Sequence, residues 1–137
     1  MCIIEIMSFK KVRNAHRTEN TEDYLELIAD LLNENGEARI VDVAEKLDVA
    51  QATANKTIKR LLIQGYIKKE PYRSIFLTSE GQIIANKSKK KHKIVYQFLK
   101  NLGLDDQTAS ADSEGIEHHV SEKTLIKMDK HNKLKKK

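Results

Sequence analysis

The sequence predicts a mainly α-helical protein with one small β-hairpin. Only 5 glycines and 1 proline occur in 137 residues, which argues against a loop-rich β protein. Apolar residues recur at helical spacing along most of the chain, whereas two short runs on either side of Pro71 have the β-branched and aromatic composition of strands. A chain of this length is sufficient for one domain or for two small ones that share a core.

The first clear helix is expected to begin near residue 20. Asn20 or Thr21 can cap it, and Gly36 stops it. Its core face consists of apolar residues at positions i, i+3, i+4, i+7 and i+8: Tyr24, Leu27, Ile28, Leu31 and Leu32. Residues 1–19 precede this helix and are expected to form an N-terminal arm or a frayed helix.

Residues 40–65 have the pattern of a helix-turn-helix. A short amphipathic helix is followed by a tight turn at 48–50 and by a second helix that Gly65 ends. The polar face of the second helix has amide and hydroxyl groups near its N-terminus, which suit base edges, and cations further along, which suit phosphates. These candidate DNA-binding residues are Gln51, Thr53, Asn55, Lys56, Lys59 and Arg60. An ordinary solvent-exposed helix face would have a similar composition.

Two strand-like runs, 66–70 and 75–78, follow this motif and are separated by a short turn. A hairpin directly after a helix-turn-helix is the wing of a winged-helix domain, and Lys68 and Arg73 would then lie beside the DNA backbone. The two motifs together are more specific than either one. They predict a winged-helix DNA-binding domain over residues 20–80.

The rest of the chain is expected to be helical over residues 81–129 and to end in a disordered basic tail, 130–137. Ser79 and Gln82 have the spacing of a capping box that opens a long helix. The stretch 87–93 in this helix contains five lysines. We interpret it as a solvated connecting segment between two domains, with a nucleic-acid patch as the alternative.

The segment 114–119, Glu-Gly-Ile-Glu-His-His, contains a candidate metal site. On a helix, Glu114, Glu117 and His118 stand at i, i+3 and i+4 and project from one face. Carboxylate oxygen and imidazole nitrogen without a thiolate suit Mn(II), Fe(II), Zn(II) or Ni(II). Three side chains supply half of a coordination sphere, so the other ligands must come from elsewhere in the chain. The alternative is a surface helix with ordinary charges.

Three further side chains could contribute to such a site. Asp23 and Glu26 flank the apolar stripe of the first helix, three residues apart. Without partners, Asp23 would only complement the helix dipole and Glu26 would only be solvated. His92, in the lysine-rich stretch, is the third candidate, because its imidazole could face the same space as those acids.

The charge balance favours a polyanionic partner. The 25 Lys and Arg residues against 20 Asp and Glu give a net charge of +5, and a basic surface most commonly binds nucleic acid. The single cysteine, Cys2, cannot form an internal disulfide. No segment has the length and apolar character of a signal peptide or a membrane span. The protein is therefore expected to be cytoplasmic, with no membrane partner.

The chain from about residue 18 to about residue 127 resembles the manganese-transport regulators within the diphtheria-toxin-repressor family of metal-dependent bacterial repressors. The matching words are Thr21-Glu22-Asp23-Tyr24-Leu25-Glu26, Gly36-Glu37-Ala38-Arg39, Tyr72-Arg73-Ser74-Ile75-Phe76-Leu77-Thr78-Ser79-Glu80-Gly81 and Glu114-Gly115-Ile116-Glu117-His118-His119. The first and last of these segments carry metal ligands in that family, and their occurrence together is specific for it.

The resemblance implies a site for two Mn(II) ions per subunit. Its ligands would be Asp23, Glu26, His92, Glu114, Glu117 and His118. In the related iron-responsive branch the family pattern has Met at the position of Asp23 and Cys at that of Glu117, so the harder ligands here point to Mn(II). Ala50 and Ala52 stand where relatives often have a capping Ser and a Pro, which leaves the operator preference open.

The resemblance also implies a homodimer joined through its C-terminal helices. Its two winged-helix heads would bind a palindromic operator in double-stranded DNA and repress manganese-uptake genes. The expected architecture is an N-terminal winged helix-turn-helix followed by an all-helical metal-binding and dimerisation domain. An iron- or zinc-responsive repressor of the same fold is one alternative, and a winged-helix regulator of a small organic ligand is another. An enzyme with a di-metal centre is not expected, because the chain has no Glu-x-x-His motif.

Overall fold

The first helix, α1, begins at Ile3 and ends at Asn35. The computed structural model describes residues 3–71 and 74–135, with the backbone alone for 3–16. The expected helix start at residue 20 or 21 is wrong, because α1 runs through both positions; no glycine or proline interrupts the chain before them. Gly36 ends the helix as predicted, with a φ of +72° that residues with a Cβ rarely adopt.

The chain divides into two compact units. Residues 20–86 form one of them, the winged-helix unit, and the described residues before 20 and after 86 form the other, the helical unit. Helices α1 and α4 each contribute residues to both units. None of the helices in the described part of the chain combines the length and the apolar character needed to cross a membrane.

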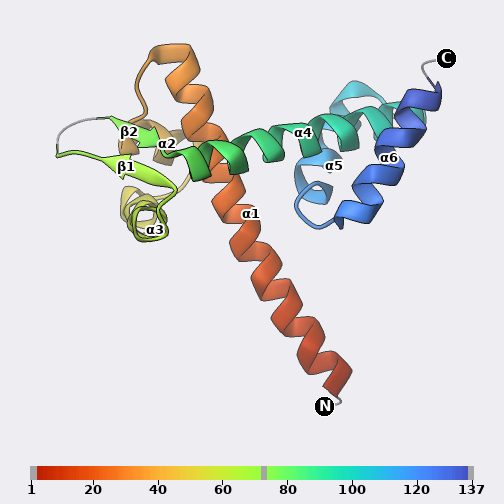
Figure 1. Cartoon of the computed structure of the whole chain (residues 1–137), viewed down its shortest axis with the longest axis horizontal. Coiled ribbons are helices and arrows are strands. Elements are labelled where there is room, and N and C mark those ends of the chain that lie inside the picture. Colours follow the sequence, from red (N-terminus) through yellow and green to blue (C-terminus); the bar gives the residue numbers. More distant parts are fainter. Residues whose placement is uncertain (1–2, 72–73, 136–137) are drawn as a thin grey trace. The chain divides into compact units, whose positions relative to one another are not determined.

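The winged-helix unit contains the predicted helix-turn-helix, α2 (Ile40–Leu47) and α3 (Gln51–Ile63) (Figure 1). Asp48 makes the turn between them in the left-handed backbone conformation, with φ of 54°. Ala50 precedes α3 and makes no capping hydrogen bond through its side chain. Apolar side chains of α1, α2, α3 and the wing form one core, whose fully buried members include Leu25, Ile28, Val43, Leu61 and Ile75.

The wing is a two-stranded antiparallel hairpin of β1 (Ile67–Lys69) and β2 (Ile75–Leu77). It is fixed to the residues that follow α1. The Ile75 amide donates to the Ala38 carbonyl at 2.8 Å, and the Ala38 amide donates to Ser74 Oγ at 2.7 Å. The fold class predicted from the sequence is therefore confirmed in this unit, with strands slightly shorter than expected.

The residue that caps α4 (Ser79–Asn101) is Thr78, so the expected cap at Ser79 is wrong. Thr78 Oγ1 accepts a hydrogen bond from the Gly81 amide at 3.2 Å and donates one to the Gly65 carbonyl at 2.6 Å. At Gly81, an added Cβ would lie 2.0 Å from the Tyr66 carbonyl oxygen. The start of α4 therefore fits against the end of the helix-turn-helix only because residue 81 has no side chain.

In the helical unit, α5 (Asp106–Ile116) and α6 (Glu122–Lys135) pack against the second half of α4 (Figure 1). Asp105 caps α5, since its carboxylate accepts a hydrogen bond from the Thr108 amide at 2.7 Å. The apolar core of the unit is small. Its buried members are Val95, Leu99, Ala109 and Leu125.

The expected disorder of the basic tail from residue 130 is wrong for the residues that the structure describes, because α6 continues to Lys135. The buried Asn132 holds this end of α6. Its amide donates to the Ile94 carbonyl at 3.1 Å, and its Oδ1 accepts from Asn101 Nδ2 at 2.9 Å. Ile94 and Asn101 both belong to α4. The end of α6, which has no apolar periodicity, is therefore held against α4 by the hydrogen bonds of a buried amide.

Candidate metal centre and DNA-binding face

A buried carboxylate lies between two imidazoles in the helical unit. Glu117 is 2% exposed. Its Oε2 is 2.7 Å from His92 Nδ1, and its Oε1 is 3.2 Å from His118 Nε2, on a ring that is itself fully buried. A buried carboxylate is stable only where positive charge or hydrogen-bond donors face it. Here each of its oxygens faces a different histidine.

Glu114 lies beside this cluster, and its Oε1 is 3.7 Å from His92 Nδ1. It is mostly exposed and belongs to the last turn of α5, whereas Glu117 is the residue that caps the C-terminus of that helix. His118 follows in a turn, so the expected helix does not extend through all three residues of the segment. The helical spacing still applies between Glu114 and Glu117, because the Glu117 amide bonds to the Ser113 carbonyl at 3.0 Å.

The side chains around His92 hold its ring on the α4 side of the cluster. The ring stacks on Tyr96, with ring centroids 6.1 Å apart. The Tyr96 hydroxyl donates to Asp106 Oδ1 at 3.0 Å, and Lys100 Nζ is 2.7 Å from the same oxygen. The hydrogen bonds from Lys100 and Tyr96 lower the pKa of Asp106, and the hydrogen bond to Asp106 raises the pKa of Tyr96. Asp106 therefore stays charged and orients Tyr96.

The cluster fits a hard or borderline divalent cation. One ligand atom each from His92, Glu114 and Glu117 lies within 4.8 Å of the others. Two ligands of one ion are at most about 4.4 Å apart when each is about 2.2 Å from it, so small side-chain movements would bring all three onto one cation. The donors are carboxylate oxygen and imidazole nitrogen, as Mn(II), Fe(II) and Zn(II) accept.

The structure brings together four of the six predicted ligands, His92, Glu114, Glu117 and His118. The other two, Asp23 and Glu26, are half-buried residues of α1 in the winged-helix unit. Their participation in the site stays a prediction.

One acid near this centre was missed from the sequence. Glu19, on α1, has its Oε2 3.1 Å from His119 Nε2 in the helical unit. It was overlooked because the helix was expected to begin after it. The signal was present in the spacing, since Glu19, Asp23 and Glu26 stand at i, i+4 and i+7.

The predicted DNA-binding face lies on α3. Its exposed residues are Gln51, Thr53, Lys56 and Lys59. The other two predicted residues, Asn55 and Arg60, are half-buried. Arg60 also has an internal role, because its Nη1 donates to Thr21 Oγ1 at 2.9 Å and to Gln64 Oε1 at 3.1 Å. On the wing, Lys68 is exposed, whereas Arg73 lies outside the described residues.

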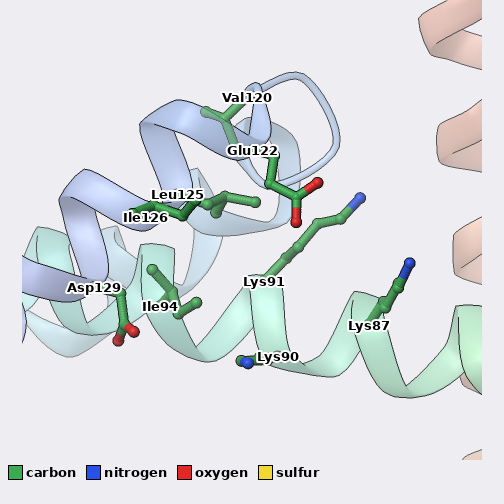
Figure 2. A pocket seen from close by; sticks show the side chains of 9 residues that line it. All are labelled: Lys87, Lys90, Lys91, Ile94, Val120, Glu122, Leu125, Ile126 and Asp129. Atoms are coloured by element: carbon green, nitrogen blue, oxygen red, sulfur yellow. The ribbon is translucent and has the colours of Figure 1, made fainter.

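The lysine-rich stretch of α4 borders a pocket of about 350 Å³ in the helical unit. Figure 2 shows lysines on α4 along one side and two acids from α6 on the other, around an apolar middle. The lining residues are Lys87, Lys90, Lys91, Ile94, Val120, Glu122, Leu125, Ile126 and Asp129. The stretch begins where the chain leaves the winged-helix unit and belongs to the helical unit.

Comparison with known proteins gives two adjacent domain matches. Residues 16–75 match the model of the iron dependent repressor N-terminal DNA binding domain, and residues 78–134 match that of the iron dependent repressor metal binding and dimerisation domain. The chain is 50% identical over 120 residues to the transcriptional regulator MntR of Escherichia coli O6:H1, covering 88% of this chain and 77% of that protein. It is 39% identical over 104 residues to the HTH-type transcriptional regulator MntR of Bacillus subtilis strain 168, covering 76% of this chain and 73% of that protein.

Two solved structures have the same fold. One is the manganese regulator SloR, with a TM-score of 0.72 and 29% identity over 81% of this chain. The other is a manganese-dependent transcriptional repressor in complex with manganese, with a TM-score of 0.76 and 25% identity over 82% of this chain. The matches cover 52% of each of those chains, so this chain spans about half of their length. With both domain models matched in order along most of the sequence, the chain belongs to the iron-dependent repressor family.

Proposed function

We propose that this protein is a Mn(II)-responsive repressor that acts in the cytoplasm as a homodimer, rather than an enzyme. Its two winged-helix heads bind a palindromic operator and repress manganese-uptake genes. The observation that carries the proposal is the buried Glu117 carboxylate, which faces His92 through one oxygen and His118 through the other, with Glu114 beside them. The relatives named as manganese regulators support the choice of metal.

The proposed site holds two ions per subunit. Glu117 would help to hold them through both of its oxygens, which face different imidazoles. His92, Glu114 and His118 would be the other ligands from the helical unit. Asp23 and Glu26 are proposed to complete the set. Bound divalent cations supply the positive charge that offsets four carboxylates, whose mutual repulsion is otherwise unfavourable.

The link to DNA binding runs through α1. Asp23 and Glu26 alternate along this helix with Leu25 and Ile28, which are fully buried in the core of the winged-helix unit. A restraint on the two acids therefore acts on the whole DNA-binding unit. In a dimer, that restraint fixes the separation of the two reading heads. Half-sites on one face of a duplex are about 34 Å apart or a multiple of that distance, so a wrong separation forfeits the contacts of one head.

The test is DNA binding measured by fluorescence anisotropy. A duplex is selected from a random library by the protein in the presence of Mn(II), and binding is then titrated in Mn(II), Fe(II) and Zn(II) separately. Mn(II) is expected to raise the affinity about 5- to 150-fold, and the duplex is expected to tighten Mn(II) binding by the same factor. A larger effect of Fe(II) or Zn(II) would indicate a repressor for that metal. Equal affinity with and without every metal would contradict the proposal and favour a sensor of an organic ligand.

A further inference from the structure

Glu19 lies where an additional ligand of the metal centre would be. Its Oε2 is 3.1 Å from His119 Nε2, and the contact joins residues 100 positions apart in the sequence. His119 directly follows His118, and a carboxylate oxygen of Glu19 lies within 4.8 Å of a ring nitrogen of His118. Two ligands of one ion are at most about 4.4 Å apart, so this upper bound on their separation is only slightly larger. Glu19 therefore needs only a small side-chain rotation to share a cation with His118.

The burial of these groups favours a cation between them. The His118 side chain is fully buried, whereas the Glu19 side chain is 30% exposed and that of His119 is 42% exposed. Glu19 thus has room to change partner, and His118 does not. A carboxylate that leaves the exposed imidazole of His119 for a divalent cation exchanges a weak, solvent-screened contact for a stronger one.

The position of Glu19 on α1 also favours a cation beside its carboxylate. It precedes Asp23 by four residues and Glu26 by seven, so the three acids follow one face of the helix over two turns. Like charges at this spacing repel one another and destabilise a helix. A cation held beside Glu19 would offset part of that repulsion, and Glu19 extends the proposed ligand set by one turn toward the N-terminus.

We propose that Glu19 is a seventh metal ligand, which supplies a carboxylate to the ion held by His118. This inference rests on the proposed function, since it adds a residue to the same site. It makes the ligand set richer in carboxylate oxygen, which Mn(II) tolerates better than the softer cations that prefer nitrogen and sulfur. Glu19 would therefore favour Mn(II) over Zn(II).

The test compares Glu19→Gln with Glu34→Gln, which changes an exposed acid on the same helix. Mn(II) binding to the full chain is measured by electron paramagnetic resonance of the free ion, and Zn(II) binding by competition with a chromophoric chelator. Glu19→Gln is expected to weaken Mn(II) binding at least about tenfold and to weaken Zn(II) binding less. Glu34→Gln is expected to change neither. Unchanged Mn(II) affinity in Glu19→Gln would overturn the assignment.

A third variant, His119→Asn, separates a ligand from a residue that acts through His119. It removes the imidazole that Glu19 contacts and keeps the carboxylate. Mn(II) affinity close to that of the unmodified protein is expected. If His119→Asn and Glu19→Gln weaken binding equally, Glu19 acts only by positioning His119 and the assignment is wrong. If the unmodified protein binds no Mn(II), the proposed function fails as a whole, which is distinct from a failure of Glu19 alone.

Discussion

The two units of this protein bury different kinds of groups. Among the described side chains, the winged-helix unit has a cluster of fourteen buried apolar residues, whereas that of the helical unit has four. The helical unit instead buries a carboxylate and an imidazole side by side, Glu117 and His118, whereas the winged-helix unit buries a carboxylate, Glu22, and has no histidine. Apolar burial stabilises a fold without any ligand, but buried charge is favourable only with a matching charge nearby. Metal should therefore stabilise the helical unit much more than the winged-helix unit.

The largest expected effect is that of Glu117→Gln, which removes the central charge and keeps the size of the side chain. Mn(II) affinity should fall at least about 100-fold. Saturating Mn(II), at about 100 times its Kd, should raise the unfolding free energy of the unmodified protein by about 2.7 kcal/mol and, at the same concentration, that of the variant by at most about 0.4 kcal/mol. Urea denaturation with and without Mn(II) measures both values. Glu45→Gln, on the exposed surface of α2, is the control, and retained stabilisation in Glu117→Gln would contradict the comparison.

The next effect concerns the winged-helix unit and requires no metal. Gly81→Ala should lower its unfolding free energy by at least about 1–3 kcal/mol, because the new Cβ would meet the Tyr66 carbonyl oxygen at 2.0 Å. Gly115→Ala, in α5 with nothing within 4 Å of an added Cβ, should be neutral or stabilising by up to about 1 kcal/mol. Thermal unfolding followed by circular dichroism compares the two variants. Equal losses would show that the close approach at Gly81 is unimportant.

A smaller effect separates two cations of α3. Lys59 is exposed, so Lys59→Ala should weaken binding to all DNA sequences and reduce the slope of log affinity against log salt by about 1. Arg60 is bonded to Thr21 and Gln64, so Arg60→Ala should instead lower the stability of the winged-helix unit. Anisotropy at several salt concentrations measures the first effect, and urea denaturation measures the second. A loss confined to one base position in Lys59→Ala would argue against a phosphate contact.

The smallest effect is that of Asp106→Asn, since the side chain is 79% exposed. The pKa of Asp106 is lowered, first by its hydrogen bond to Lys100 and then by that to Tyr96. A lowered folded-state pKa means stability that is present above the unfolded-state pKa of about 3.9 and lost as the pH falls through the folded-state value. The protein should thus exceed the variant slightly in stability at pH 7 and equal it at strongly acidic pH. Urea denaturation across this range tests the sign.

Most of the fold could be predicted from local patterns. The helix-turn-helix and the wing depend on periodicity and on turn residues that lie close together in the sequence, and both were placed within a few residues. The start of α1 could not be predicted in this way, because a polar stretch without glycine or proline fits either a helix or a disordered arm. The helical tail was missed for a related reason, since the contacts of Asn132 with α4 become visible only in the folded chain.

The candidate site shows the same limit. The donor types and spacing of the segment from Glu114 to His118 predict a candidate metal site, and His92 is a candidate because its imidazole could face the acids of the first helix. Glu19 stands one helical turn before Asp23 in the sequence, but its relation to His119 exists only in three dimensions. The cap at Thr78 was assigned one residue late for the same reason. Ser79 also suits a cap, and the contact of Thr78 with the Gly65 carbonyl decides between them.

The wing of this protein is fastened at its base as well as through Ser74 and Ile75. The Thr78 amide bonds to the Tyr66 carbonyl at 3.1 Å, the Thr78 hydroxyl bonds to the Gly65 carbonyl, and Gly81 leaves room for both. Insertions or deletions between Lys69 and Ser74 should therefore leave the helices that carry the hairpin undisturbed. Such length changes would allow a family of these proteins to acquire new DNA contacts while the scaffold behind the wing stays the same.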